Sequence, residues 1–97
     1  MAKRIAWTHA SEIQLQVILD FFIDRNKSKI YSLKLYRKIH FEVNKLIKFP
    51  EMGKPTDFVG IRALIIVDYI VFYEELIDNI IIHKVWDSRQ DERKLKF

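Results

Sequence analysis

The sequence predicts an α+β domain of order β-α-α-β-β-β, in which a helical hairpin packs on a small antiparallel sheet. Three observations predict it. Two stretches with apolar residues at helical spacing fill the first half of the chain, a turn-rich segment follows, and three stretches rich in β-branched and aromatic residues come last. With 97 residues, of which 49% are hydrophobic, the chain has the size and composition of a single globular domain, 1–97.

The chain begins with a short extended stretch, 4–7, which leads into the first helix. Thr8 is a candidate N-cap, and Ser11 with Gln14 forms an overlapping capping-box pattern. We expect this helix to run to about Arg25, before a polar break. The apolar residues that recur along it at helical spacing are Ile13, Val17, Ile18, Phe21 and Phe22.

A second helix follows and must end before Pro50, because proline cannot continue a helix. Its apolar face consists of Leu35, Ile39, Val43, Leu46 and Ile47. Two long helices joined by a few residues form an antiparallel hairpin.

The second half of the chain is predicted to be a meander of strands. Segment 51–57 is the only turn-rich stretch, and 59–67, 69–73 and 80–86 are rich in Ile, Val and aromatic residues. The tail, 87–97, is polar and charged. One face of such a sheet covers the helices, and the other is a partly exposed working face.

Composition and charge exclude several classes of protein. Cysteine is absent, so there is no disulfide framework and no thiolate chemistry, and we expect a cytoplasmic protein. The longest apolar stretch, 63–73, is interrupted by Asp68 and is too short to cross a membrane. The net charge of +4 permits an anionic partner, either a nucleic acid or an acidic protein.

The second helix carries a basic stripe on the face opposite its apolar residues. It consists of Lys34, Arg37, Lys38, Phe41, Lys45 and Lys48. Basic residues with an aromatic side chain among them can follow a phosphate backbone, and they can equally bind an acidic protein. The same pattern is also typical of an ordinary solvated helix face.

Three further side chains are candidates for chemistry. Arg62 interrupts an apolar strand, so it needs either an ion-pair partner or an anion on the working face. His83 is either structural or an acid–base group, and Arg89 follows the last strand, where it either binds an anion near Arg62 or pairs locally with an aspartate.

No cofactor or metal is expected. His9, His40 and His83 are far apart in sequence and form no pair at metal-ligand spacing. The chain has only two glycines and no phosphate-binding loop.

Five motifs occur in order along nearly the whole chain. They are the Trp7-Thr8-x-Ala10 start, the segment Phe49-Pro50-Glu51-Met52-Gly53-Lys54-Pro55, Gly60-Ile61-Arg62, the strand Tyr69-Ile70-Val71-Phe72-Tyr73, and the ending His83-Lys84-Val85-Trp86-x-x-Arg89-Gln90-Asp91. With them the sequence resembles the RelE/ParE toxin superfamily of type II toxin–antitoxin systems. The resemblance implies a small toxin neutralised by a cognate acidic antitoxin, with a homodimer or a toxin–antitoxin hetero-oligomer as possible assemblies.

The resemblance also implies one of two activities. ParE-like members block DNA gyrase by protein binding and need no catalytic centre. RelE-like members cut mRNA on the ribosome, and here Arg62, Arg89, His83 and Tyr69 would be the catalytic candidates. This chain has Ile70 where the nucleases commonly have arginine. That departure favours a ParE-like toxin, with a RelE-like endonuclease as the alternative.

Overall fold

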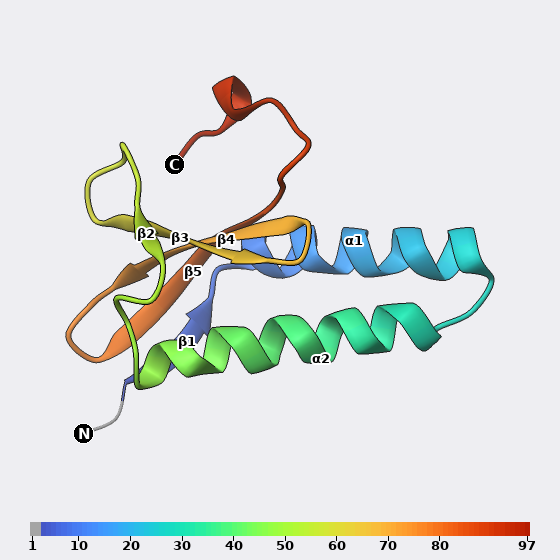
Figure 1. Ribbon diagram of the computed structural model, residues 1–97, viewed down its shortest axis with the longest axis horizontal. Helices are drawn as coiled ribbons and strands as arrows, with labels where there is room; N and C mark the ends of the chain where they lie inside the picture. The colour runs from blue at the N-terminus through green and yellow to red at the C-terminus, as the bar shows by residue number, and fades with distance from the viewer. Residues whose placement is uncertain (1–2) are drawn as a thin grey trace.

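The computed structural model describes residues 3–97, apart from the side chain of Glu92. A hairpin of two helices lies beneath a five-stranded sheet, and the C-terminal segment lies on the other side of the sheet (Figure 1). The strands follow one another in the spatial order β1-β5-β4-β3-β2. The predicted α+β architecture is therefore confirmed.

The hairpin consists of α1, His9–Asn26, and α2, Ile30–Asn44, which continues as the short helix η1, Lys45–Ile47. Thr8 caps α1 as predicted, since its side chain accepts a hydrogen bond from the Ser11 backbone N–H at 3.1 Å. The helix ends at Lys27, whose backbone is left-handed with φ 53°. The first helix therefore begins and ends close to the predicted positions, and the second ends before Pro50, as predicted.

The predicted meander is formed by β3, Ile61–Ile66, β4, Tyr69–Glu75, and β5, Asn79–Asp87. A short strand that the sequence did not indicate, β2 at Lys54–Pro55, pairs with β3 inside the predicted turn segment. A further short helix, η2 at Glu92–Lys94, lies in the tail.

The sheet is mixed rather than antiparallel, because β1, Arg4–Trp7, runs parallel to β5. Parallel neighbours need a long crossover connection, and the whole chain between these two strands serves as that connection. The sequence prediction of an antiparallel sheet was wrong for this edge. A strand as short as β1, with 4 residues, does not indicate whether the strand beside it runs parallel or antiparallel.

The core lies between the hairpin and the sheet. It includes the predicted apolar face of α2, with Ile47 only half-buried at its end. Its members are Leu15, Leu19, Leu35, Ile39, Val43, Leu46, Leu64, Ile66, Tyr69, Val71, Tyr73, Ile80, Ile82 and Val85.

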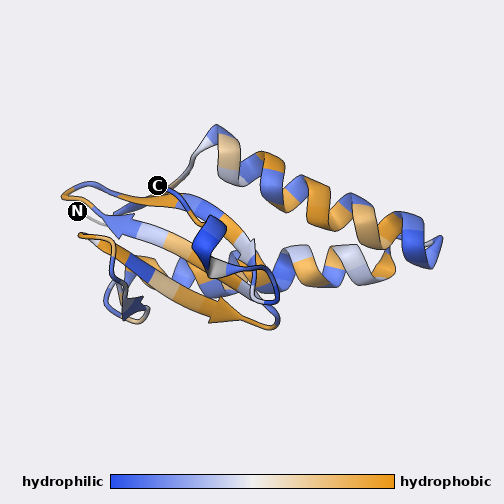
Figure 2. Cartoon of the chain, turned by 90° about the horizontal axis from the view of Figure 1, so that it is seen from above, coloured by the Kyte–Doolittle hydropathy of each residue, from blue (hydrophilic) through white to orange (hydrophobic). Residues whose placement is uncertain are grey.

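The apolar residues of α1 divide between two sides of the helix. Leu15 and Leu19 are buried, whereas Ile13, Val17 and Phe21 are exposed by 49%, 62% and 55%. The far end of the hairpin projects beyond the sheet, and apolar residues recur along α1 where no strand covers it (Figure 2). The stripe that marks this helix in the sequence is therefore largely its exposed one.

Candidate functional site

Arg62 lies on the helix-facing side of β3, opposite Tyr73 of β4. Its guanidinium Nη1 donates hydrogen bonds to the carbonyl oxygens of Gly53, at 2.7 Å, and Glu51, at 3.4 Å. Because two backbone carbonyls of this loop accept hydrogen bonds from Nη1, Arg62 anchors the loop before β2.

Tyr73 binds the same loop through its hydroxyl group. The side chain is fully buried, its hydroxyl donates to the Pro50 carbonyl at 2.7 Å, and it accepts from the Gly53 N–H at 2.8 Å. Burial raises the pKa of the Tyr73 phenol, so it is protonated at neutral pH and can make both bonds. We call this set of Arg62, Tyr73, Gly53 and Pro50 the loop clamp.

Arg89 and Tyr69 come together at the opposite end of the sheet. Arg89 makes two hydrogen bonds to the carboxylate of Asp87, Nε to Oδ1 at 3.0 Å and Nη2 to Oδ2 at 2.7 Å. This hydrogen bonding lowers the pKa of Asp87. Tyr69 is buried, which raises its pKa, and both Tyr69 and Arg89 line one groove.

His83 lies on the other face of the sheet, where β5 has a register irregularity opposite Phe72 and Tyr73. Its Nε2 is 3.0 Å from Oε1 of Glu74. The C-terminal segment covers part of this face, because the ring of Phe97 lies 5.1 Å from the Phe72 ring and 6.3 Å from the His83 ring.

The four residues named for a nuclease are thus found in three places. Arg62 pairs across the sheet with Tyr73, and Asp87 pairs with Tyr69. Positions 73 and 69 are about 13 Å apart along β4, at ~3.3 Å per residue. His83 is on the opposite face, so the described side chains form no single acid–base constellation.

The predicted basic stripe on α2 is present at the surface. Lys34, Arg37, Lys38 and Phe41 are exposed, and Lys45 Nζ lies 4.8 Å above the Phe41 ring. Glu42, which was not among the predicted site residues, lies within the stripe.

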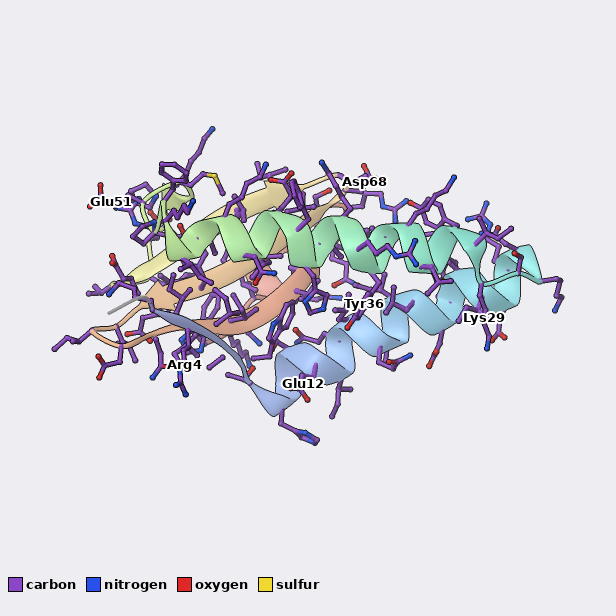
Figure 3. All side chains as sticks on the ribbon, turned by 90° about the horizontal axis from the view of Figure 1, so that it is seen from below. Arg4, Glu12, Lys29, Tyr36, Glu51 and Asp68 are labelled. Carbon is purple, nitrogen blue, oxygen red and sulfur yellow. The ribbon has the colours of Figure 1, made fainter. Side chains whose placement is uncertain are left out.

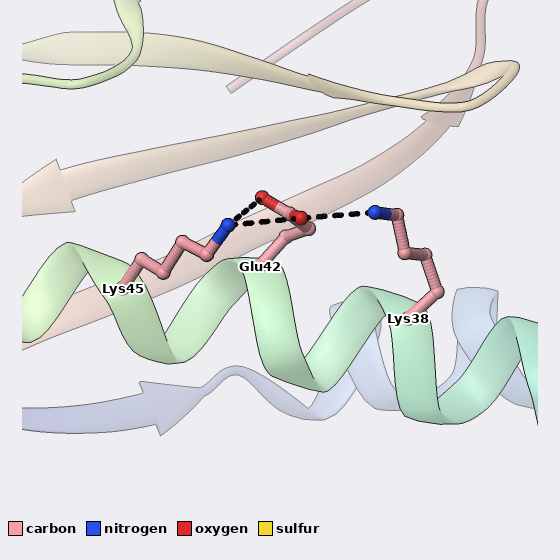
Figure 4. A network of polar contacts seen from close by, with 3 residues as sticks. All are labelled: Lys38, Glu42 and Lys45. Atoms are coloured by element: carbon pink, nitrogen blue, oxygen red, sulfur yellow. Dashed lines mark hydrogen bonds and ion pairs between the residues drawn. The ribbon is translucent and has the colours of Figure 1, made fainter.

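Glu42 bridges two of these lysines, at 3.0 Å to Lys38 and 3.2 Å to Lys45 (Figure 4). Hydrogen bonding from Lys38 and then Lys45 lowers the pKa of Glu42. Its i+4 spacing from Lys38 was the signal that could have revealed the pairing. The stripe therefore keeps a positive charge smaller than its lysine count suggests.

A groove of about 410 Å³ separates α1 from the end of β5. The side chain of Gln14 crosses it, and its Oε1 accepts a hydrogen bond from the Val85 backbone N–H at 2.9 Å. The groove is lined by Ile13, Gln14, Val17, Ile18, Phe21, Phe22, Tyr69, Val85, Trp86, Asp87, Arg89 and Gln90. Sequence reasoning did not predict it.

His40 of α2 lies between two aromatic rings. Its ring centroid is 5.0 Å from that of Trp7 and 4.3 Å from that of Tyr36. Tyr36 is labelled between the two helices in Figure 3, which views the hairpin from below. Burial lowers the pKa of His40 below its ordinary value of 6.5.

This shift predicts a loss of stability on acidification. Between the lowered pKa of folded His40 and 6.5, the unfolded chain binds the proton and the folded chain does not. The contribution of neutral His40 to the free energy of unfolding is therefore fully present above pH 6.5, and it is lost as the pH falls below that value. Urea unfolding at pH 7.5 and 5.5 should show a larger loss for the wild type than for His40→Phe, and equal losses would contradict the assignment to His40.

Comparison with known proteins supplies the family. A family model described as the ParE toxin of the type II toxin–antitoxin system, parDE, matches residues 5–92. The chain belongs to the ParE toxin family. As a member, it is the toxin component of a type II toxin–antitoxin module, and an antitoxin is its expected partner.

The ParE fold is also found in a solved structure. That of the chromosomal ParDE toxin–antitoxin system from P. aeruginosa has a TM-score of 0.78 and 19% identity, and the alignment covers 89% of this chain and 96% of that one. The search of curated proteins gave no match. No helix within residues 3–97 of this ParE family member is long and apolar enough to cross a membrane.

Proposed function

We propose that this ParE family toxin arrests growth by binding DNA gyrase in the cytoplasm, with no bond-breaking step of its own. One observation carries the proposal: the residues that a nuclease would need are dispersed. Two of them are held in structural contacts, Arg62 by loop carbonyls and Arg89 by Asp87. A ribonuclease must activate a hydroxyl, stabilise the phosphate and protonate the leaving oxygen at one place.

The strand that would carry a central nuclease arginine supports the same interpretation. Ile70 faces the side of the sheet where Phe97 packs, and it pairs with Trp86. An apolar pair cannot stabilise phosphate charge. The RelE-like alternative therefore depends on His83, which is paired with Glu74.

The test compares inhibition of DNA supercoiling by purified gyrase with cleavage of mRNA in a translation extract, both without antitoxin. Wild-type protein should inhibit supercoiling and leave mRNA intact. Arg89→Ala and His83→Ala should inhibit within about twofold of the wild type, since surface substitutions change free energies by about 0.5 kcal/mol or less. Cleavage in the ribosomal A site that either variant abolishes would establish the RelE-like activity instead.

A further inference from the structure

The helical hairpin has an open side that faces away from the sheet. Between α1 and α2 this side is hollowed by a groove of about 240 Å³, which we call the underside groove. Leu19 and Ile23 of α1 and Leu33 and Tyr36 of α2 are among the residues that line it. Leu33 and Tyr36 are exposed by 49% and 45%, and Figure 3 shows this side with Tyr36 between the helices and the sheet behind them. The monomer therefore leaves apolar side chains uncovered along this groove.

The two helices that border the underside groove carry opposite charges. Within its bounds α1 has three carboxylates and one arginine, whereas α2 has three basic side chains and one glutamate. The exposed charges beside the groove include Glu12 and Asp20 on the α1 flank, and Lys29 and Arg37 on the α2 flank. Among the described residues, no ion pair joins any of these four side chains to a counter-charge. Each molecule thus has an acidic flank and a basic flank that it does not neutralise itself.

The acids and bases of the two flanks lie at matching levels along the hairpin. Ser32 Oγ donates to the Leu19 carbonyl oxygen at 2.7 Å, so these two residues lie side by side on the antiparallel helices. At ~1.5 Å per residue, the level of Asp20 then differs by about 3 Å from that of Lys29, and the other acid and base differ by the same amount. A helix placed over its opposite number can therefore bring each acid close to a base.

We propose that the underside groove binds a second copy of this chain, and that the two hairpins form a four-helix bundle. The two-fold axis runs along the hairpin, so that α1 of one protomer lies over α2 of its partner. Leu33 and Tyr36 of each protomer pack into the groove of the other, and Asp20 faces Lys29 of the partner subunit. The bundle leaves the outer face of both sheets free, so the dimer presents two equivalent surfaces to a target.

Charge complementarity favours a second copy over other occupants. An acidic segment would match only the α2 flank and a basic segment only the α1 flank, whereas an inverted copy matches both. The other two-fold arrangement would stack α1 on α1 and bring carboxylates together. The chain's own tail lies across the opposite side of the sheet, where Phe97 packs on Phe58 and Phe72 (Figure 1). The inference does not depend on gyrase being the target.

Sedimentation equilibrium of the purified toxin, over a concentration series and without antitoxin, tests the dimer. The wild type should show a monomer–dimer equilibrium. Leu33→Asp places a carboxylate in the apolar contact and should raise the dissociation constant of the dimer by at least ~30-fold, which corresponds to about 2 kcal/mol. Leu76→Asp makes the same change at a residue of the turn between β4 and β5 that is exposed by 44%, and the dissociation constant should stay within about twofold of the wild type.

An exchange of charges tests the arrangement of the helices. Asp20→Lys and Lys29→Asp should each weaken the dimer, since each brings like charges together at two symmetry-related places. The two substitutions combined in one chain should restore the affinity, because each acid again faces a base. A double variant that dimerises no better than the single variants overturns the packing of α1 over α2.

Thermal unfolding of each variant verifies the fold, and Leu33→Ser replaces Leu33→Asp if the latter unfolds. A wild type that stays monomeric at every concentration overturns the proposal, as does a dimer that the Leu33 variants leave intact. The proposal is also wrong if Leu33→Asp weakens binding of the antitoxin without changing self-association, since the occupant is then the antitoxin. Gyrase inhibition is measured separately, so a wild type that dimerises without inhibiting gyrase refutes only the proposed target.

Discussion

Replacement of Gly53 by alanine is expected to destabilise the protein by about 3–5 kcal/mol, because it overpacks the loop clamp and disturbs its buried hydrogen bonds. A Cβ at this position would lie 2.6 Å from both Cε1 and the hydroxyl oxygen of Tyr73, and 3.0 Å from the Ala63 carbonyl oxygen. Tyr73 is fully buried in the core and Ala63 is part of the sheet, so neither can move aside cheaply.

The measurement is the unfolding free energy from urea titration. Gly60→Ala is the matched control, because a Cβ there meets only Glu74 Oε2 at 3.8 Å. Gly60 has φ +77°, so its replacement should cost only the backbone strain of about 1–2 kcal/mol. If the two alanine variants are equally stable, the steric argument for Gly53 is refuted.

Tyr73→Phe is expected to cost about 2–4 kcal/mol, because one buried and one partly buried backbone group lose their partner at once. The Gly53 N–H and the Pro50 carbonyl both depend on the Tyr73 hydroxyl. Tyr69→Phe is the control, since Tyr69 is also buried but makes no such hydrogen bonds within residues 3–97, and it should change stability by about 0.5 kcal/mol or less.

The two clamp substitutions should also be coupled. In a Tyr73→Phe background the contact with the hydroxyl oxygen is gone, so Gly53→Ala should cost less than it does in the wild type. Strict additivity in the double-mutant cycle would mean that the two residues stabilise the loop independently.

Much of the fold could be predicted because local chemistry and tertiary structure agree. Thr8 has the hydroxyl that an N-cap needs, and the α2 stripe that includes Ile39 has one apolar side, so its buried face follows from spacing alone. The strands β3 to β5 are dense in β-branched and aromatic residues. In each of these cases, only one arrangement of the predicted element buries its apolar residues.

The candidate site was harder to predict, because its contacts join residues far apart in the sequence. Arg62 was expected to pair with a carboxylate or another anion, yet it donates to backbone carbonyls of a loop. Composition alone does not distinguish these kinds of hydrogen-bond acceptor. α1 has apolar residues on two of its sides, so spacing could not tell which side is buried. The groove follows from the different lengths of β1 and β5, which only the pairing reveals.

The pairing of β1 with β5 also determines when the molecule can be completed during synthesis. Residue 4 finds its partner only at residue 79, so the first strand made is among the last to be placed. The hairpin of α1 and α2 needs only local contacts and can form while the chain is still growing. The edge of the sheet, and with it the groove beside α1, is assembled only once β5 has left the ribosome. A nascent chain thus carries the exposed apolar side of α1, with Ile13, Val17 and Phe21, before it has the groove beside that helix.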